Sequence, residues 1–432
     1  MERLEQYCGR LLTADQLPAA YHELAQKMPA MTKKSGHFFC NRCAGQVENT
    51  HRLPDGSFYC RACLVFGRLT SKDSLYWLEQ KAFPAQQALL WEGQLTAFQQ
   101  EVSDALLAGI QEKTDLLVHA VTGAGKTEMI YETIAHVISQ GGSVALASPR
   151  IDVCLELHRR LQKDFACPIS LLHGQSEAYE RAPLLIATTH QLIKFYQAFD
   201  LLIIDEVDAF PFVDNPMLYH ALNQSLKTDG VKIFLTATST QELDRQVKKG
   251  QLKKINLARR FHANPLVVPK TVWLPSLIPA LKKRRLPKTL LKRLQVQRKT
   301  GFPLLLFFPN IDRGQAFAEC LQEFLPNDRI AFVSSRTESR LDKVEAFRKK
   351  EIDILVSTTI LERGVTFPCV DVFVLEANHR LFTKSALVQI SGRTGRSIER
   401  PTGELLFFHD GLTTAIQQTI SEIKEMNRRG GF

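Results

Sequence analysis

A glycine-rich run that ends in lysine and threonine carries the clearest chemistry in this sequence. It consists of Ala120, Val121, Thr122, Gly123, Ala124, Gly125, Lys126 and Thr127. An apolar, strand-like stretch at residues 116–120 precedes it and a helix-like pattern at residues 128–138 follows, which is the context that a phosphate-binding loop requires. Backbone N–H groups freed by the glycines can surround phosphates, Lys126 can reach the outer phosphates, and the Thr127 hydroxyl can bind Mg²⁺. The run therefore predicts a site for ATP and magnesium.

Two adjacent acids, Asp205 and Glu206, follow an apolar stretch at residues 201–204. Continuous apolar runs of this kind suit the central strands of a parallel sheet, and ligands bind beyond the carboxyl ends of such strands. Asp205 is therefore placed to hold the magnesium ion, and Glu206 to orient and deprotonate the attacking water. An isolated acidic pair is more often a solvated loop, but the phosphate-binding loop upstream favours the catalytic interpretation.

Arg393 and Arg396 are candidates for the charge neutralisation that phosphoryl transfer needs. Glycines at positions 392 and 395 accompany them, and the three-residue spacing predicts a close-packed helix start with both guanidinium groups on one face. Surface arginines are common, so this segment alone would be weak evidence. Beside Lys126 and Glu206, we predict that both arginines act at the nucleotide.

Four cysteines form two C-x2-C pairs, Cys40 with Cys43 and Cys60 with Cys63, separated by 16 residues. This spacing suits a four-cysteine zinc site, in which four thiolates fill the tetrahedral shell and the metal is structural. Disulfides or free thiols are the alternative. A disulfide framework would imply secretion, and residues 1–6 lack the pattern of a signal peptide. We therefore expect a cytoplasmic protein that carries zinc.

Length and charge agree with a two-lobed protein that binds a polyanion. The 432 residues are enough for two lobes of about 150 residues plus a small appendage. The formal net charge of +10 predicts nucleic acid or an acidic membrane surface as a partner. No apolar run approaches the roughly 18 residues of a spanning helix, so we expect any attachment to the inner face of the cell membrane to be peripheral.

Apolar runs predict the strands of two parallel sheets. They lie at residues 116–120, 143–147, 183–187, 201–206 and 231–235, and then at residues 304–308, 352–357, 370–375 and 404–408. Helical stretches alternate with them, which is the pattern of α/β folds. A final amphipathic helix is expected at residues 413–426.

In this order along residues 95–396, the motifs resemble those of superfamily 2 helicases and translocases. The resemblance implies two RecA-like lobes, an adenine contact from Gln99, and a segment around Gly364 that touches both nucleotide and nucleic-acid backbone. It also implies that residues 235–238 couple hydrolysis to lobe movement. The loops that it assigns to DNA binding contain Pro149, Arg150, His173, Gly174, Thr188, Thr189, Thr358 and Thr359.

Within that superfamily the chain most resembles the ComFA family, late competence proteins that act as DNA-uptake ATPases in Gram-positive bacteria. Residues 205–211, the Arg260-Phe261-His262 triplet and the four cysteines ahead of the motor carry this closer match. The PriA helicases are more distant, since they place their zinc cysteines within the second half of the motor. The resemblance implies single-stranded DNA as substrate, a ComFC-like phosphoribosyltransferase-fold protein and DprA as partners, and a peripheral contact with the membrane DNA-uptake channel.

The predicted organisation has five parts. These are a helical N-terminal segment (residues 1–34), a zinc knuckle (35–67), a connector (68–93), an ATP-binding lobe (94–265) and a C-terminal lobe (266–432). We predict an ATP-driven translocase on single-stranded DNA. The alternatives are a PriA-like or other DNA helicase, an RNA helicase, or a zinc scaffold with a degenerate motor, against which the intact Lys126, Glu206 and Arg396 argue. The basic run at residues 282–299 is either a solvated helix face or a DNA contact.

Overall fold

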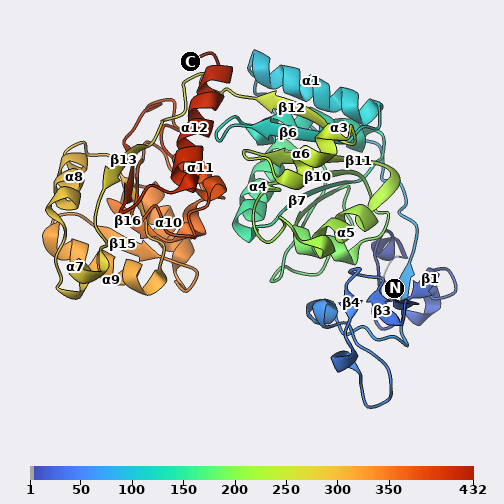
Figure 1. Ribbon diagram of the computed structural model, residues 1–432. Coiled ribbons are helices and arrows are strands. Elements are labelled where there is room, and N and C mark those ends of the chain that lie inside the picture. Colours follow the sequence, from blue (N-terminus) through green and yellow to red (C-terminus); the bar gives the residue numbers. More distant parts are fainter. Residues whose placement is uncertain (1–3) are drawn as a thin grey trace. The chain divides into compact units, whose positions relative to one another are not determined.

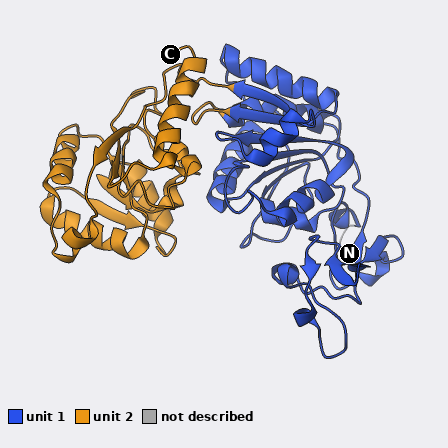
Figure 2. Cartoon of the chain, viewed as in Figure 1, with its two compact units in different colours: residues 1–119, 126–256 blue, residues 120–125, 257–432 orange. Residues whose placement is uncertain are grey.

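The computed structural model describes residues 4–432 and divides the chain into two compact units (Figures 1 and 2). Unit 1 contains the described residues up to His119, together with Lys126–Asn256. Unit 2 contains Ala120–Gly125 and Leu257–Phe432. The first six residues of the glycine-rich run therefore pack with unit 2, although the strand before them and the helix after them belong largely to unit 1.

A seven-stranded sheet forms the centre of unit 1, with the strand order β12-β6-β11-β10-β7-β9-β8. The pairings of β6 with β11, β11 with β10, β10 with β7, β7 with β9 and β9 with β8 are all parallel. Strands β7 and β9 are buried throughout, as expected for a sheet with helices on both faces. The strands are β6 (Leu116–Ala120), β7 (Val144–Ser148), β8 (Ile169–Leu172), β9 (Leu184–Thr188), β10 (Phe199–Asp205), β11 (Leu226–Thr236) and β12 (Lys253–Leu257).

Helices connect these strands and cover the sheet of unit 1. They are α1 (Ala97–Gln111), α2 (Lys126–Met129), α3 (Tyr131–Ser139), α4 (Ile151–Asp164), α5 (Pro216–Ser225) and α6 (Gln241–Lys248). Several begin at a side-chain cap, which satisfies an N–H group of the first turn. Asn215 caps α5 and is followed by Pro216, and Thr240 caps α6.

Small β structures, rather than helices, precede the large sheet. β1 (Gln26–Pro29) pairs with β5 (Ser74–Trp77), and β2 (Met31–Lys34), β3 (His37–Cys40) and β4 (Gln46–Val47) form a three-stranded antiparallel sheet. The prediction of a helical segment at residues 1–34 is wrong for residues 4–34, which contain only short 3-10 turns besides strands. Leu12 and Tyr76 exchange backbone hydrogen bonds of 2.8 and 2.7 Å. Pairing with a distant strand thus overrides the local helical preference.

Unit 2 is built on a six-stranded parallel sheet with the order β13-β18-β17-β14-β16-β15. Its strands are β13 (Lys270–Trp273), β14 (Leu304–Phe307), β15 (Ile330–Val333), β16 (Ile354–Ser357), β17 (Asp371–Val374) and β18 (Leu405–His409). The two parallel sheets confirm the predicted α/β fold with two RecA-like lobes. Within residues 4–432, no helix is both long and apolar enough to cross a membrane.

The two faces of the unit 2 sheet bear different helices. Leu304 and Leu306 of β14 pack with α8 (Lys288–Arg298) and α9 (Ile311–Phe324), beside α7 (Ile278–Lys282). Leu305 and Phe307 point to the opposite face, where α10 (Arg340–Arg348), α11 (Lys384–Ser391) and α12 (Thr414–Arg429) contribute to the core. This alternation follows from the two-residue period of a strand.

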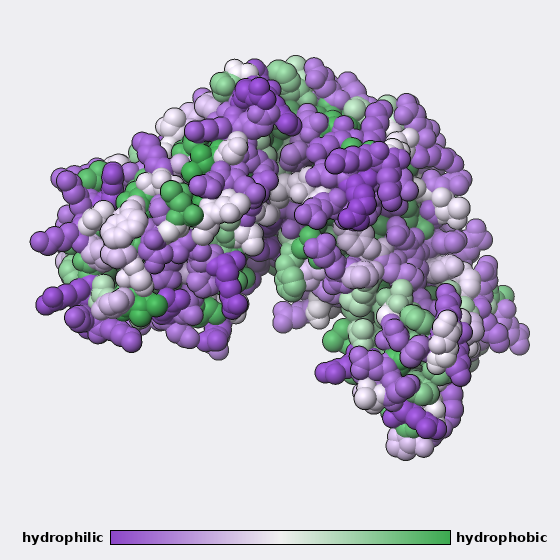
Figure 3. Space-filling model, viewed as in Figure 1, coloured by the Kyte–Doolittle hydropathy of each residue, from purple (hydrophilic) through white to green (hydrophobic). Residues whose placement is uncertain are grey.

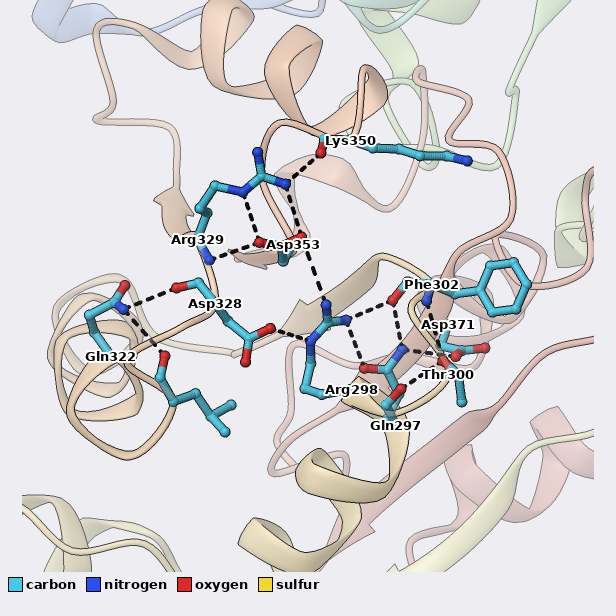
Figure 4. Close-up of polar contacts among 11 residues, drawn as sticks. Gln297, Arg298, Thr300, Phe302, Gln322, Asp328, Arg329, Lys350, Asp353 and Asp371 are labelled. Carbon is cyan, nitrogen blue, oxygen red and sulfur yellow. Dashed lines mark hydrogen bonds and ion pairs between the residues drawn. The ribbon is translucent and has the colours of Figure 1, made fainter.

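A network of polar side chains lies at the amino ends of the strands of the unit 2 sheet. Asp371, the first residue of β17, is fully buried and pairs with Arg400 at 2.7 Å. The amide of Gln297 donates to the same carboxylate at 2.9 Å, and Arg298 binds Asp328 at 2.7 Å (Figure 4). Because these groups satisfy one another, the network explains by structure alone why polar side chains gather at this edge.

Candidate functional site

The glycine-rich run has the strand, loop and helix setting that its sequence predicts. β6 ends at Ala120, and α2 begins at Lys126. Gly123 and Gly125 have φ angles of +79° and +76°, a backbone conformation in which a side chain would be strained. The two glycines therefore let the loop curl so that successive N–H groups can face one anion. Lys126 and Thr127 occupy the first turn of α2.

The acidic pair lies at the same edge of the unit 1 sheet as α2. Asp205 ends β10 and is in register with Leu235 of β11, which is in register with Val118 of β6. Glu206 has a φ of +56°, so the chain turns sharply directly after the strand. The carboxyl ends of β6 and β10 thus bring Lys126 and the two acids to one edge, separated by a single strand.

Asp208, for which the sequence alone predicts no role, connects the acidic loop to the end of β11. Its Oδ1 lies 2.7 Å from the Thr236 hydroxyl, and its Oδ2 accepts a hydrogen bond from the Thr238 hydroxyl. All three side chains are buried. Thr236 and Thr238 belong to the segment expected to couple hydrolysis to lobe movement. Asp208, two residues after Glu206, is therefore a side-chain link between the two segments, beside the backbone hydrogen bond from Val207 to the carbonyl of Leu235.

The loops expected to bind DNA occupy the other half of the same edge. Ser148 is in register with Thr188, and Leu172 with Ala187, so the loops after β7, β9 and β8 are neighbours. These loops carry Pro149, Arg150, His173, Gly174, Thr188 and Thr189. The Thr189 side chain is 0% exposed and Thr188 is also buried, whereas Gly174 is exposed. Backbone groups, Arg150 and His173, rather than the two hydroxyls, are thus the accessible candidates on this edge.

Gln99 has a clear structural role in unit 1. Its Oε1 accepts a hydrogen bond of 2.9 Å from the backbone N–H of Thr96, while the Thr96 side chain caps the Gln99 N–H. This reciprocal pair is a capping box, which fixes the start of α1. The adenine contact of Gln99 stays a prediction.

The two arginines follow the end of a helix rather than the start of one, so that part of the prediction is wrong. Gly392 is the C-cap of α11, and Gly395, in the turn after the helix, has a φ of +65°, a conformation that favours glycine. Arg393 is buried, and its Nε donates to the carbonyl of Glu362 at 3.2 Å. Arg396 is only half-buried, so it is the better placed of the two for contact with a ligand.

The remaining candidates of unit 2 lie in one loop at the carboxyl edge of its sheet. Thr358 and Thr359 directly follow β16. Gly364, with a φ of +79°, lies five residues further along the same loop. The hydrogen bond from Arg393 to Glu362 joins this loop to the residues after α11, which brings the second-lobe motifs together.

The four cysteines of the zinc segment converge on one point. Their Sγ atoms all lie within 4.8 Å of one another, with 3.7 Å between Cys40 and Cys63 and 3.5 Å between Cys43 and Cys60. Four thiolates bound to one zinc ion stand about 3.8 Å apart, whereas a disulfide joins sulfurs at about 2.0 Å. All four are buried. The donor set and its geometry therefore fit one tetrahedral zinc ion and no disulfide.

Arg42, between the first two cysteines, ties the two halves of the zinc segment together. It is buried, and its guanidinium donates to the carbonyls of Cys63 at 3.2 Å, Phe66 at 3.2 Å and Gly67 at 2.6 Å. The positive charge of Arg42 favours the thiolate form of Cys63, which is the form that zinc requires.

The basic run at residues 282–299 lies on α7 and α8, on the face of the unit 2 sheet opposite α11. Hydrophilic side chains project from this part of unit 2 (Figure 3). A cavity of about 660 Å³ there is lined by Lys292, Gln295, Val296, Arg298, Lys299 and Leu325. α8 and α9 end beside it and lead into the starts of β14 and β15. The cavity therefore lies at the sheet edge opposite the one that carries Thr358.

Two protein families match the two lobes. The DEAD/DEAH box helicase family matches residues 96–246, and the helicase conserved C-terminal domain matches residues 282–397. The chain is 59% identical to competence protein ComFA of Streptococcus pneumoniae over 426 residues, covering 99% of both chains. It is 39% identical to competence protein ComFA of Bacillus subtilis over 397 residues, covering 90% of this chain and 85% of the relative.

Solved structures share the fold of the two lobes. Dbp5 of S. cerevisiae bound to RNA and ADP BeF3 has a TM-score of 0.54 at 15% identity, over 77% of this chain and 91% of Dbp5. RecG bound to a three-way DNA junction has a TM-score of 0.53 at 17% identity, over 78% of this chain and 47% of RecG. At these identities the likeness shows a shared fold alone.

Proposed function

Because the chain belongs to the ComFA family of competence proteins, which are superfamily 2 helicase-like ATPases, we propose that it uses ATP hydrolysis to move along single-stranded DNA. One observation carries the proposal. The sheet of unit 1 gathers the phosphate-binding helix and the acidic pair at one half of its carboxyl edge, and the candidate strand loops at the other half. ATP hydrolysis at the first half of this edge can therefore change how DNA is held at the second half.

In the proposed reaction, Lys126 neutralises charge on the outer phosphates of ATP. Thr127 and Asp205 would hold the magnesium ion, which would supply positive charge that lowers the repulsion between the phosphates and the incoming nucleophile. Glu206 orients the attacking water and takes its proton. Arg396 stabilises the charge that develops on the transferred phosphoryl group, while Arg393 holds the loop around Glu362 in place.

Coupling between hydrolysis and movement runs, in this proposal, through Asp208. The acid follows Glu206 by two residues and binds the hydroxyls of Thr236 and Thr238. A change in the position of the acidic loop on hydrolysis would therefore be transmitted to the end of β11. Coupling of this kind needs an element with two arrangements that both sites bias.

We propose that the protein binds single-stranded DNA through the phosphates of the DNA backbone. The candidate loops offer backbone N–H groups, Arg150 and His173, which can hold a backbone without reading its bases. The net charge of +10 supports such contact with a polyanion. Binding should then depend weakly on sequence and strongly on salt.

The biological role that we propose is the uptake of transforming DNA into the cytoplasm during competence. It follows from the family, as do the proposed partners: a ComFC-like phosphoribosyltransferase-fold protein, DprA, and the DNA-uptake channel, approached from the inner face of the membrane. The zinc segment lies outside both matched helicase domains. We therefore propose it as a contact for one of these partners or for DNA.

The ATPase rate of the purified chain, without polymer and with single-stranded DNA, duplex DNA or RNA, tests the proposal. Single-stranded DNA should stimulate the rate most, and Glu206→Gln should abolish the stimulated rate while keeping DNA binding. Greater stimulation by RNA would favour an RNA helicase instead. No ATP hydrolysis under any condition would favour the scaffold.

A further inference from the structure

A buried arginine outside the helicase motifs contacts the turn that carries Arg396. Arg260 lies in the triplet Arg260-Phe261-His262, shortly after β12 and within unit 2. Its side chain is only 3% exposed. The turn formed by residues 392–396, called the arginine turn below, follows α11 in the same unit.

Within the described part of the chain, the guanidinium of Arg260 donates only to backbone carbonyls of the arginine turn. Nη1 donates to the carbonyl of Thr394 at 3.0 Å and to that of Gly395, and Nη2 lies 3.4 Å from the carbonyl of Gly392. The ring Nε2 of His262 lies 3.2 Å from the Gly395 carbonyl as well. The triplet therefore holds three of the five residues of the turn.

The same triplet also contacts the glycine-rich run. The backbone N–H of Phe261 donates to the carbonyl of Gly123 at 3.3 Å. A methyl group placed on Gly123 would lie 3.7 Å from Nε of Arg260 and 3.7 Å from Cγ of Arg396. Because residues 120–125 pack within unit 2, Arg260 stands where the phosphate-binding run and the arginine turn meet.

The charge at this position is not balanced by an acid. Among residues 4–432, no carboxylate forms an ion pair with Arg260, and burial together with the charge of Arg396 lowers the pKa of Arg260 to about 9. A buried cation held by neutral groups costs stability. Packing alone therefore does not explain an arginine at this position. The planar guanidinium holds several N–H donors in fixed directions, which suits several carbonyls of one turn.

We infer that Arg260 is a positioning residue for ATP hydrolysis, which fixes the arginine turn so that Arg396 stays beside Gly123. The inference rests on the proposed role of Arg396 in hydrolysis. Lysine would keep the positive charge but cannot donate in several fixed directions at once. Misplacement of a catalytic group by about 1 Å can cost about 100-fold in rate. Arg260→Lys should accordingly lower kcat by about 10-fold or more.

A double-mutant cycle on the full chain tests this inference. The variants are Arg260→Lys, Arg396→Ala and the pair together, with kcat measured at saturating single-stranded DNA. Fluorescent ATP-analogue binding and thermal unfolding are measured for each variant. Arg259→Lys is the matched control, because Arg259 is the adjacent arginine and its Nε donates to the carbonyl of Gly430. The control should match the parent in kcat.

The expected result is that Arg260→Lys lowers kcat while the analogue binds within about threefold of the parent, and that the double variant is no slower than Arg396→Ala. The inference is wrong if the fall in kcat of the double variant equals the product of the falls in the two single variants, or if Arg260→Lys keeps the parental kcat. Arg396→Ala at the parental rate would instead refute the proposed role of Arg396.

A second variant protects the test against a folding defect. If Arg260→Lys does not purify in a folded form, His262→Ala removes a separate contact to the Gly395 carbonyl. It should lower kcat in the parent but not in the Arg396→Ala background. A loss of equal size in both backgrounds would overturn the positioning role.

Discussion

The link between the acidic loop and the end of β11 predicts that Asp208→Asn uncouples ATP binding from turnover. The variant keeps the shape of the side chain but removes its charge. The carboxylate contacts the hydroxyls of Thr236 and Thr238, and Asp208 itself is 9% exposed. Asparagine would retain one acceptor oxygen and turn an NH2 group toward the other hydroxyl.

The size of the effect follows from these two contacts. A hydrogen bond to a charged group contributes about 1.5–3 kcal/mol and a neutral one about 0.5–1.5 kcal/mol, so the loss is about 1 kcal/mol per contact and about 2 kcal/mol in all. For a unit of this size that corresponds to a fall in Tm of about 4–8 °C. If these about 2 kcal/mol are lost entirely from the stabilisation of the transition state, kcat falls by about 30-fold.

The assay is steady-state ATP hydrolysis with single-stranded DNA, together with ATP-analogue binding and thermal unfolding of the same preparations. Asp214→Asn is the control, since Asp214 is an exposed acid on the same loop. We expect Asp208→Asn to bind the analogue like the parent while kcat falls. A variant with a lowered Tm but the parental kcat would show that Asp208 only stabilises unit 1, and the coupling argument would be refuted.

Three further outcomes follow from the arrangement of the candidate sites. Lys126→Ala should weaken both ATP binding and turnover, whereas Glu206→Gln should spare binding and lower kcat by about 100-fold or more; parental hydrolysis by Glu206→Gln would contradict the assignment of the base. Cys40→Ser should reduce bound zinc from about one ion per chain to near zero in metal analysis and expose the zinc segment to protease, while ATPase without polymer persists. Zinc-free parental protein would refute that site. Replacing Lys292 and Lys299 together by glutamine should leave the salt dependence of single-stranded DNA binding unchanged, because both lysines border the cavity at the amino ends of the strands, away from the loops expected to bind DNA. If the slope of log K against log salt concentration became smaller in magnitude by about 1.4, two phosphate contacts would have been lost.

The interior strands of both large sheets could be predicted from the sequence, whereas the outermost strand on each side of each sheet could not. Runs such as residues 201–204 and 304–308 are apolar throughout because helices cover both faces of those strands. In the two large sheets, the four described strands that were not predicted, β8, β12, β13 and β15, are the outermost ones. β13, for example, is mostly exposed. An edge strand has fewer buried neighbours, so it does not need the continuous buried run of an interior strand, and β8 alternates between buried and partly buried residues.

Sites made by nearby residues were readable from the sequence, and contacts between distant segments were not. The cysteine spacing alone predicted the sulfur cluster. By contrast, Arg260 meets Gly395 across 135 residues of sequence, so its triplet could be noticed but not assigned a contact. The pattern of Thr96 followed three residues later by Gln99 also carried a local signal, the capping box, beside the adenine contact implied by resemblance.

Displacement of streptavidin from the end of a biotinylated single-stranded oligonucleotide tests the central claim most directly. We predict that the parent removes streptavidin from one end in the presence of ATP, and that it does not do so with a non-hydrolysable analogue. Glu206→Gln should bind the oligonucleotide but leave streptavidin in place with ATP. DNA-stimulated ATP hydrolysis without displacement from either end would contradict translocation.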